Sequence, residues 1–448
     1  MTVIAFKLMV VIATTLLGVA VLRWPALATM PERRFLAIAL GIQLVPVTTV
    51  FMALYVVGNH VGPSDVSGFY VPAARAVLAG QLPDRDFAQS YAPLFPYLGA
   101  ALLYLWNSSK MFALFTIALN AVALLLWHWT TLTRFDTLEA RQTSVLYATS
   151  GHVFIQSLLG TNQIWVATAL AGSALLLVRG RAVGSGLTQA LAACTTKLLV
   201  LLFWPVFWIC APRRTRWLLV PVLLSASVYG VFTLLGADVL DPVRREGALF
   251  SSGNLPYLVQ PLLSATDRYG HLVFDALAVA AVAGSLGWIY VQARSLPPQK
   301  RPQLLLAGLA LVGLIFMAFS KKSISGYAVF FMYPAMLVAA LGMTNVRARL
   351  GFLFLFNLLL ALEPTLWFRV GRWRALSVWL GEEGGIEAAC FVLMDVALVA
   401  SYLYLAWLSA LCVRHAAGAE SAQTPPTNMH APDAAPHLAS LSLPRTHN

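Results

Sequence analysis

Ionisable side chains at three places beside or within apolar runs are candidates for chemistry. Asp65 directly precedes a run with helical spacing, Lys197 lies in the middle of a long apolar segment, and Lys321 and Lys322 lie between two others. A carboxylate can take a proton from a hydroxyl group, and a fixed ammonium group can bind a phosphate. From residue type and position alone, Asp65 is either such an acid or the N-cap of the helix that follows. The two adjacent lysines are either phosphate ligands or interfacial lysines that reach lipid headgroups.

Two further carboxylates follow Asp65 in the same polar stretch. Asp84 and Asp86 are either solvated loop acids or members of a polar cleft at the membrane surface. The histidines show no metal-ligand spacing, and the four cysteines form no CxxC pair. We therefore predict no cofactor, and a divalent metal at Asp84 and Asp86 is left as an open alternative.

The composition predicts a membrane protein. Of the 448 residues, 59% are hydrophobic and 11% are charged, and mean hydropathy is +0.75. A soluble domain carries roughly 25% charged residues. The net charge of +12 does not indicate nucleic acid, because the basic residues stand in short clusters between apolar runs, as cytoplasmic loops do.

The apolar runs predict an all-α polytopic integral membrane protein with about 11–13 transmembrane or re-entrant helices. The runs lie near residues 3–23, 35–58, 110–132, 143–160, 163–178, 217–236, 271–293, 304–319, 326–343, 350–366 and 388–412. We expect one membrane domain, residues 1–412, and a disordered cytoplasmic tail, residues 413–448. The basic clusters then place residues 59–91 in an extracytoplasmic loop that contains a short interfacial amphipathic helix.

Residues 183–211 are apolar, but the segment is flanked by basic clusters at both ends and has Lys197 at its middle. A charge at the bilayer centre costs roughly 2.5–3.5 kcal/mol. One interpretation is a re-entrant hairpin that breaks near 195–197 and returns, with Lys197 at its tip inside a protein cavity. The other is a single tilted helix with Lys197 paired or extended toward the interface.

Several motifs, in this order, resemble the GT-C superfamily of membrane glycosyltransferases. They are Asp65 at the start of a long outer loop, an aromatic residue, the run Ala73 to Gly80, Tyr91-Ala92-Pro93-Leu94, Gly160-Thr161-Asn162-Gln163, Leu191 to Lys197, and Ser320-Lys321-Lys322-Ser323 with Tyr327. The closest likeness is to the bacterial polyprenyl-phosphate-sugar-dependent group that includes α-mannosyltransferases. Ala92 stands where that group usually has proline, and Thr161-Asn162 is inserted in its Gly-Gln turn. These departures leave the sugar open.

The resemblance implies a transferase that works on the extracytoplasmic face of a bacterial-type cytoplasmic (inner) membrane. It implies a polyprenyl-phosphate sugar donor, a glycan or glycolipid acceptor, inversion at the anomeric carbon, and contact with membrane lipids but not nucleic acid. Asp65 would be the catalytic base. The donor phosphate would be bound by Lys321, Lys322 and Arg75. Substrate would contact Tyr70, Asp84, Asp86, Tyr91, Asn162, Gln163, Lys197 and Tyr327.

Two other function classes fit the apolar runs. A transporter or flippase of lipid-linked saccharides would also explain Lys197, but it predicts two similar halves, and the sequence shows no convincing internal repeat. A non-catalytic membrane component of an envelope polysaccharide complex would need neither the acid at the helix entry nor the outer lysine pair.

Overall fold

Helices make up the regular structure of the part of the chain that can be described. The computed structural model describes residues 2–60, 65–247, 250–260, 269–369 and 386–418. Within these ranges the one β-type contact is an isolated bridge between Pro83 and Phe87. The predicted all-α class is confirmed. The predicted tail begins at residue 413, but α19 continues to Gly418, and residues 419–448 lie outside the described part.

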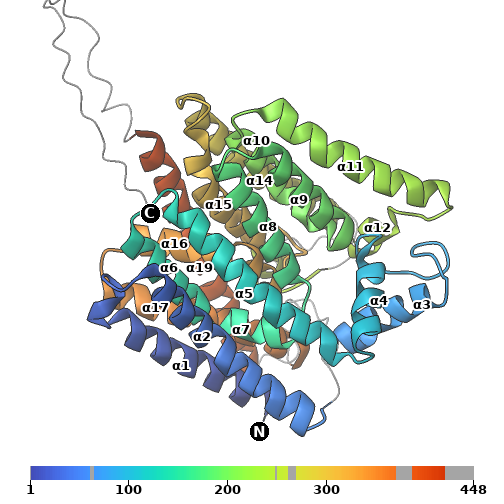
Figure 1. Ribbon diagram of the computed structural model, residues 1–448, viewed down its shortest axis with the longest axis horizontal. Helices are drawn as coiled ribbons and strands as arrows, with labels where there is room; N and C mark the ends of the chain where they lie inside the picture. Colours follow the sequence, from blue (N-terminus) through green and yellow to red (C-terminus); the bar gives the residue numbers. More distant parts are fainter. Residues whose placement is uncertain (1, 61–64, 248–249, 261–268, 370–385, 419–448) are drawn as a thin grey trace, which may run out of the picture.

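The element order is shown in Figure 1. The first half contains α1 (Val3–Leu22), η1 (Pro25–Leu27), α2 (Glu32–Phe51), η2 (Met52–Val57), η3 (Val66–Tyr70), α3 (Val71–Leu78), α4 (Phe95–Leu105), α5 (Lys110–Leu132), α6 (Thr137–Ala148), α7 (Gly151–Leu158), α8 (Gln163–Val178), α9 (Ala182–Thr195), η4 (Leu198–Phe203) and α10 (Trp204–Cys210). The second half contains α11 (Arg214–Leu234), α12 (Asp241–Gly247), α13 (Leu255–Val259), α14 (Tyr269–Arg294), η6 (Arg301–Leu304), α15 (Leu305–Phe319), η7 (Ser325–Phe331), α16 (Met332–Gly342), α17 (Val346–Arg369) and α19 (Ile386–Gly418).

Among the described residues, nine helices are long and apolar enough to cross a bilayer, or ten if the bent pair α7 and α8 forms one span. Helices α11 and α14 leave most of their apolar side chains exposed, whereas α15 and the η7–α16 segment are buried at the centre. Exposed apolar helices of this length are stable where lipid replaces water around them. The molecule is therefore a multi-pass membrane protein.

The helices form a bundle in which α8 packs between α5 and α9, and α9 packs against α11. Figure 1 shows α1 and α2 along one side of the molecule and α11 along the opposite side. Helix α15 packs against α14 and α19. Residues 143–160, predicted as one apolar run, fall into α6 and α7, because the chain breaks at Thr149–Ser150, where the Ser150 side chain caps α7.

Residues 182–210 double back on themselves. Helix α9 ends at Thr195, and η4 and α10 follow after a non-helical Thr196–Lys197 step. Ser185, early in α9, accepts a hydrogen bond from Trp217, early in α11, and Ala193, late in α9, accepts one from Tyr229, late in α11. Helices α9 and α11 therefore run in the same direction. The chain between them must return, which leaves Lys197 at the tip.

Two short helical stretches follow α2: η3 with α3 lies in the polar loop, and the apolar α4 comes after it. At 1.5 Å per residue, α3 and α4 are about 12 and 17 Å long, too short to cross a bilayer. Helix α3 stops where Gly80 takes a left-handed φ of 82°, a conformation that glycine adopts without steric cost. Tyr70 and Ala74 face the bundle, and Phe69 is exposed.

Candidate functional site

The break after α9 is stabilised by the first polar loop. The last carbonyl groups of a helix have no partner within the helix. Here the backbone N–H of Leu94 donates to the Cys194 carbonyl at 2.9 Å, and that of Ala92 donates to the Thr196 carbonyl at 3.0 Å. Two segments about 100 residues apart in the sequence are thus joined beside Lys197.

Lys197 lies between two tyrosine rings from different parts of the chain. Its Nζ atom is 5.1 Å from the ring centroid of Tyr91 and 5.2 Å from that of Tyr327. The same atom donates to the Tyr327 hydroxyl at 3.5 Å. Cation–π contacts of this length are attractive. The first loop, the α9 break and η7 therefore meet at one ammonium group.

Asp65 lies at the entrance of η3, close enough to Lys197 for their charges to interact. Its backbone is helical, and its side chain makes no capping hydrogen bond to the helix that follows. Burial raises the pKa of the Asp65 carboxyl, and the positive charge of Lys197 partly opposes that rise. The carboxylate therefore does not cap η3, and it keeps an exposed face.

Tyr70 and Tyr91 form the wall beside Asp65. Their rings meet edge to face with centroids 5.2 Å apart, and Phe95 packs against both. The Tyr70 hydroxyl accepts a hydrogen bond from the backbone N–H of Asn162 at 3.2 Å. The aromatic wall thus holds the C-terminal end of η3 against the start of α8.

A cavity of about 630 Å³ opens next to Lys197. Its polar and aromatic lining residues are Ser90, Tyr91, Lys197, Asp275, Ser320, Lys322 and Tyr327. Its apolar wall contains Leu198, Leu199, Leu202, Pro242, Val243, Ala278, Val279, Val282, Ala283, Leu286 and Phe316. The cavity is therefore amphipathic: its lining combines two lysines with aliphatic side chains, several of them from α14.

The structure separates the two adjacent lysines. Lys321 is buried, and its ammonium group donates to the Asp275 carboxylate at 2.7 Å. Lys322 is half-buried and lines the cavity. Of the pair, Lys322 is the one that can reach a ligand in the cavity.

Asp84 and Asp86 lie in a turn that packs against the second polar loop. The backbone carbonyl of Asp84 accepts from Asp238, and the Arg85 guanidinium donates to the carbonyl of Leu235. Partial burial raises the pKa of Asp84 to about 6, whereas hydrogen bonds from Arg85 lower the pKa of Asp86 to about 2. Neither carboxylate lines the cavity.

Other predicted ligands lie away from the cavity. Arg75 lies on the exposed face of α3. Asn162 and Gln163 are buried at the start of α8, and neither side-chain oxygen has a hydrogen-bond partner. Within the described ranges, no three His, Cys, Asp or Glu residues come together as a metal site would require.

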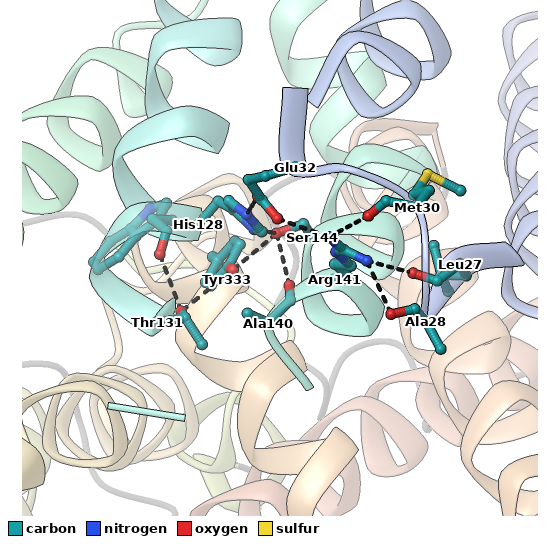
Figure 2. Close-up of polar contacts among 11 residues, drawn as sticks. Leu27, Ala28, Met30, Glu32, His128, Thr131, Ala140, Arg141, Ser144 and Tyr333 are labelled. Atoms are coloured by element: carbon teal, nitrogen blue, oxygen red, sulfur yellow. Dashed lines mark hydrogen bonds and ion pairs between the residues drawn. The ribbon is translucent and has the colours of Figure 1, made fainter. Parts of the chain in front are cut away.

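A second polar cluster joins α2, α5, α6 and α16 elsewhere in the bundle (Figure 2). The Arg141 guanidinium donates to the carbonyls of Leu27, Ala28 and Met30 and to the Glu32 carboxylate. His128 bridges Glu32 and Ser144. None of these residues lines the cavity, and their hydrogen bonds hold the turn between α1 and α2 against α6.

The sequence matches no known family model and no curated protein. Among solved structures, the fold is similar to the crystal structure of ArnT from Cupriavidus metallidurans bound to undecaprenyl phosphate. The two chains share 14% identity, with a TM-score of 0.47, over 86% of this chain and 77% of that one. This likeness concerns the fold alone.

Sequence reasoning did not single out three acids that the structure places near this region. Asp275 lines the cavity, while Glu363 and Asp395 are buried in α17 and α19. Each interrupts an apolar run. An acid inside an apolar span is costly and marks a functional or structural site. These three acids could therefore have been identified as candidates from the sequence.

Proposed function

We propose that this chain is a glycosyltransferase that moves a sugar from a polyprenyl-phosphate donor to a glycan or glycolipid acceptor. The reaction would take place at the outer face of a bacterial-type cytoplasmic membrane, with inversion at the anomeric carbon. The observation that carries the proposal is the amphipathic cavity lined by Lys197 and Lys322; Asp65 does not line it but lies close enough to Lys197 for their charges to interact. The order of the sequence motifs, which resembles GT-C glycosyltransferases, supports the same function.

The cavity suits a lipid phosphate. The aliphatic lining from α14 offers the isoprenoid chain side chains such as Val279, Val282 and Leu286. Lys322 and Lys197 also line the cavity, and the phosphate group would bind to these cations. Fixed cations stabilise a leaving group that gains negative charge in the transition state, and they do so more strongly where water is excluded.

Asp65 would serve as the general base. The acceptor hydroxyl oxygen attacks the anomeric carbon and forms the new glycosidic bond, while the bond from that carbon to the donor phosphate oxygen breaks. Asp65 takes the hydroxyl proton, and polyprenyl phosphate leaves with the electron pair. A carboxylate that is partly desolvated and makes no cap hydrogen bond is a stronger base than a capping one.

The test is transfer in proteoliposomes from a panel of synthetic polyprenyl-phosphate sugars. We expect the wild type to transfer from at least one donor, and Asp65→Asn to lower the rate by about 10²–10⁴-fold with donor binding retained. Asp238→Asn is the matched control, since this loop acid pairs with Arg244 at the surface. If the wild type transfers no sugar but moves lipid-linked sugar between leaflets, the chain is a transporter instead.

A further inference from the structure

A buried carboxylate lies behind the wall that contains Lys322. Glu363, in α17, is 2% exposed and accepts hydrogen bonds from two serine hydroxyls. One is Ser252, in the loop after α12, and the other is Ser325, at the start of η7, at 2.8 Å. Glu363 therefore joins two segments that are separate in the sequence.

The loop of residues 251–254 is in turn fastened to the segment of residues 320–327. The backbone N–H of Ser251 donates to the Lys321 carbonyl at 2.8 Å, and the Ser251 hydroxyl donates to the Ser323 carbonyl at 2.5 Å. On the other side of the loop, the N–H of Gly253 donates to Asp395 of α19 at 3.2 Å. Segment 320–327 is thus held both directly by Glu363 and through the loop.

Gly253 shows how closely the loop approaches Glu363. Its φ of 75° is left-handed, and a Cβ atom there would lie 3.4 Å from the Glu363 carboxyl carbon and 3.3 Å from Leu398. A side chain would be strained by the backbone and by its neighbours. The contact therefore depends on glycine at this position.

Glu363 is costly to bury, and it does not line the cavity. A buried carboxylate is destabilising unless hydrogen bonds and nearby positive charge compensate. Two serines supply the hydrogen bonds, and Lys7 donates to the Ala361 carbonyl at 2.7 Å, which brings a positive charge to the same part of α17. This arrangement fits a group whose role is to hold other groups in place.

We propose that Glu363 is a positioning residue for the cavity. By binding Ser252 and Ser325, it fixes segment 320–327, from which Lys322 and Tyr327 reach the ligand. Glu363 acts through that segment and does not touch the substrate. The inference rests on the proposed function for its effect on lipid binding, while its effect on the segment can be measured separately.

The first test is a double-mutant cycle with the full chain in nanodiscs and undecaprenyl phosphate as the probe. We expect Lys322→Gln to weaken binding by about tenfold or more and Glu363→Gln by about threefold or more. The double variant should lose less affinity than the sum of the two single losses, because part of the effect of Glu363 passes through Lys322. The control is Asn357→Ala. Asn357 lies in α17, as Glu363 does, and accepts buried hydrogen bonds from Ser150 and His152. This variant should bind the lipid as the wild type does.

The second test is amide hydrogen exchange in the same proteins without lipid. Glu363→Gln and Glu363→Ala should speed exchange in residues 320–327, and Asn357→Ala should not. Additive losses in the cycle, or unchanged exchange in both Glu363 variants, would overturn the positioning role. If the wild type does not bind the lipid, the proposed donor site is wrong, and exchange alone decides whether Glu363 fixes the segment.

Discussion

The ammonium group of Lys321 donates to the carboxylate of Asp275 across 2.7 Å, with the lysine buried and the aspartate open to the cavity. The neighbouring Lys322 faces the cavity instead. A carboxylate in a cavity for an anionic lipid would repel the phosphate unless a cation neutralised it. Lys321 supplies that charge to Asp275, so the proposed function assigns different roles to the two adjacent lysines.

Asp275→Asn and Lys322→Gln should therefore have opposite effects. Asp275→Asn leaves the buried Lys321 ammonium without its carboxylate, so we expect the free energy of unfolding to fall by about 2 kcal/mol or more. Affinity for undecaprenyl phosphate should hold or rise, because a negative charge has left the cavity. Lys322→Gln should change stability by less than about 0.5 kcal/mol and weaken lipid binding by about tenfold.

Thermal unfolding in detergent and lipid binding in nanodiscs, measured on both variants, check this prediction. Tyr104→Ala is a suitable surface control, since its side chain is 87% exposed at the end of α4. Loss of lipid affinity in Asp275→Asn together with unchanged affinity in Lys322→Gln would reverse the assignment of the two lysines.

Lys197 should set the pH dependence of transfer. Under the proposed function, Asp65 acts as a base in its carboxylate form, so the rate should rise as pH passes upward through its pKa. The positive charge of Lys197 lowers that pKa against the effect of burial. Lys197→Met removes the charge, and we expect the rising limb of kcat/KM against pH to move to higher pH. An unmoved limb would show that Lys197 does not act on the titrating group.

The features that could be predicted from the sequence are local ones. Apolar runs gave most of the long helices, because a span is a continuous stretch whose length is set by the bilayer. Gly80 indicated the end of α3, since a left-handed C-terminal residue favours glycine. Lys197 indicated a possible break within residues 183–211, because a charge in the middle of an unbroken span is costly.

The features that could not be predicted depend on contacts between distant segments. The local sequence around Lys321 and Lys322 does not indicate which of the two lysines forms the ion pair with Asp275, which lies 46 positions away in the chain. The two serine hydrogen bonds of Glu363 come from residues 111 and 38 positions away. The π-helical turn of η3 is another such feature: it leaves Phe69 60% exposed and buries the adjacent Tyr70 against the bundle.

Asp84 should make stability depend on pH. Its pKa is about 6 in the fold against 3.8 for the ordinary side chain, so the folded state prefers the protonated form. This contribution to stability is complete below pH 3.8 and is lost as pH rises through about 6. Asp84→Asn keeps a neutral side chain at all pH values. The Tm of Asp84→Asn relative to the wild type should therefore rise between pH 4.5 and 7.5, by an amount worth about 1 kcal/mol after solvent screening. A difference in Tm that is constant over this range would contradict the prediction.

Ala92→Pro should disturb the break after α9. Ala92 stands where the resembling glycosyltransferases usually have proline, and here its N–H donates to the Thr196 carbonyl at 3.0 Å. Proline has no N–H, so the substitution leaves that carbonyl without its donor, at a cost of about 1 kcal/mol. Since Thr196 precedes Lys197, we also expect weaker undecaprenyl phosphate binding and slower transfer. Ala88→Pro, in the same loop and without a backbone hydrogen bond to the α9 break, is the control. Equal Tm and equal transfer rates in Ala92→Pro and the wild type would show that the Ala92 hydrogen bond does not hold Lys197 in place.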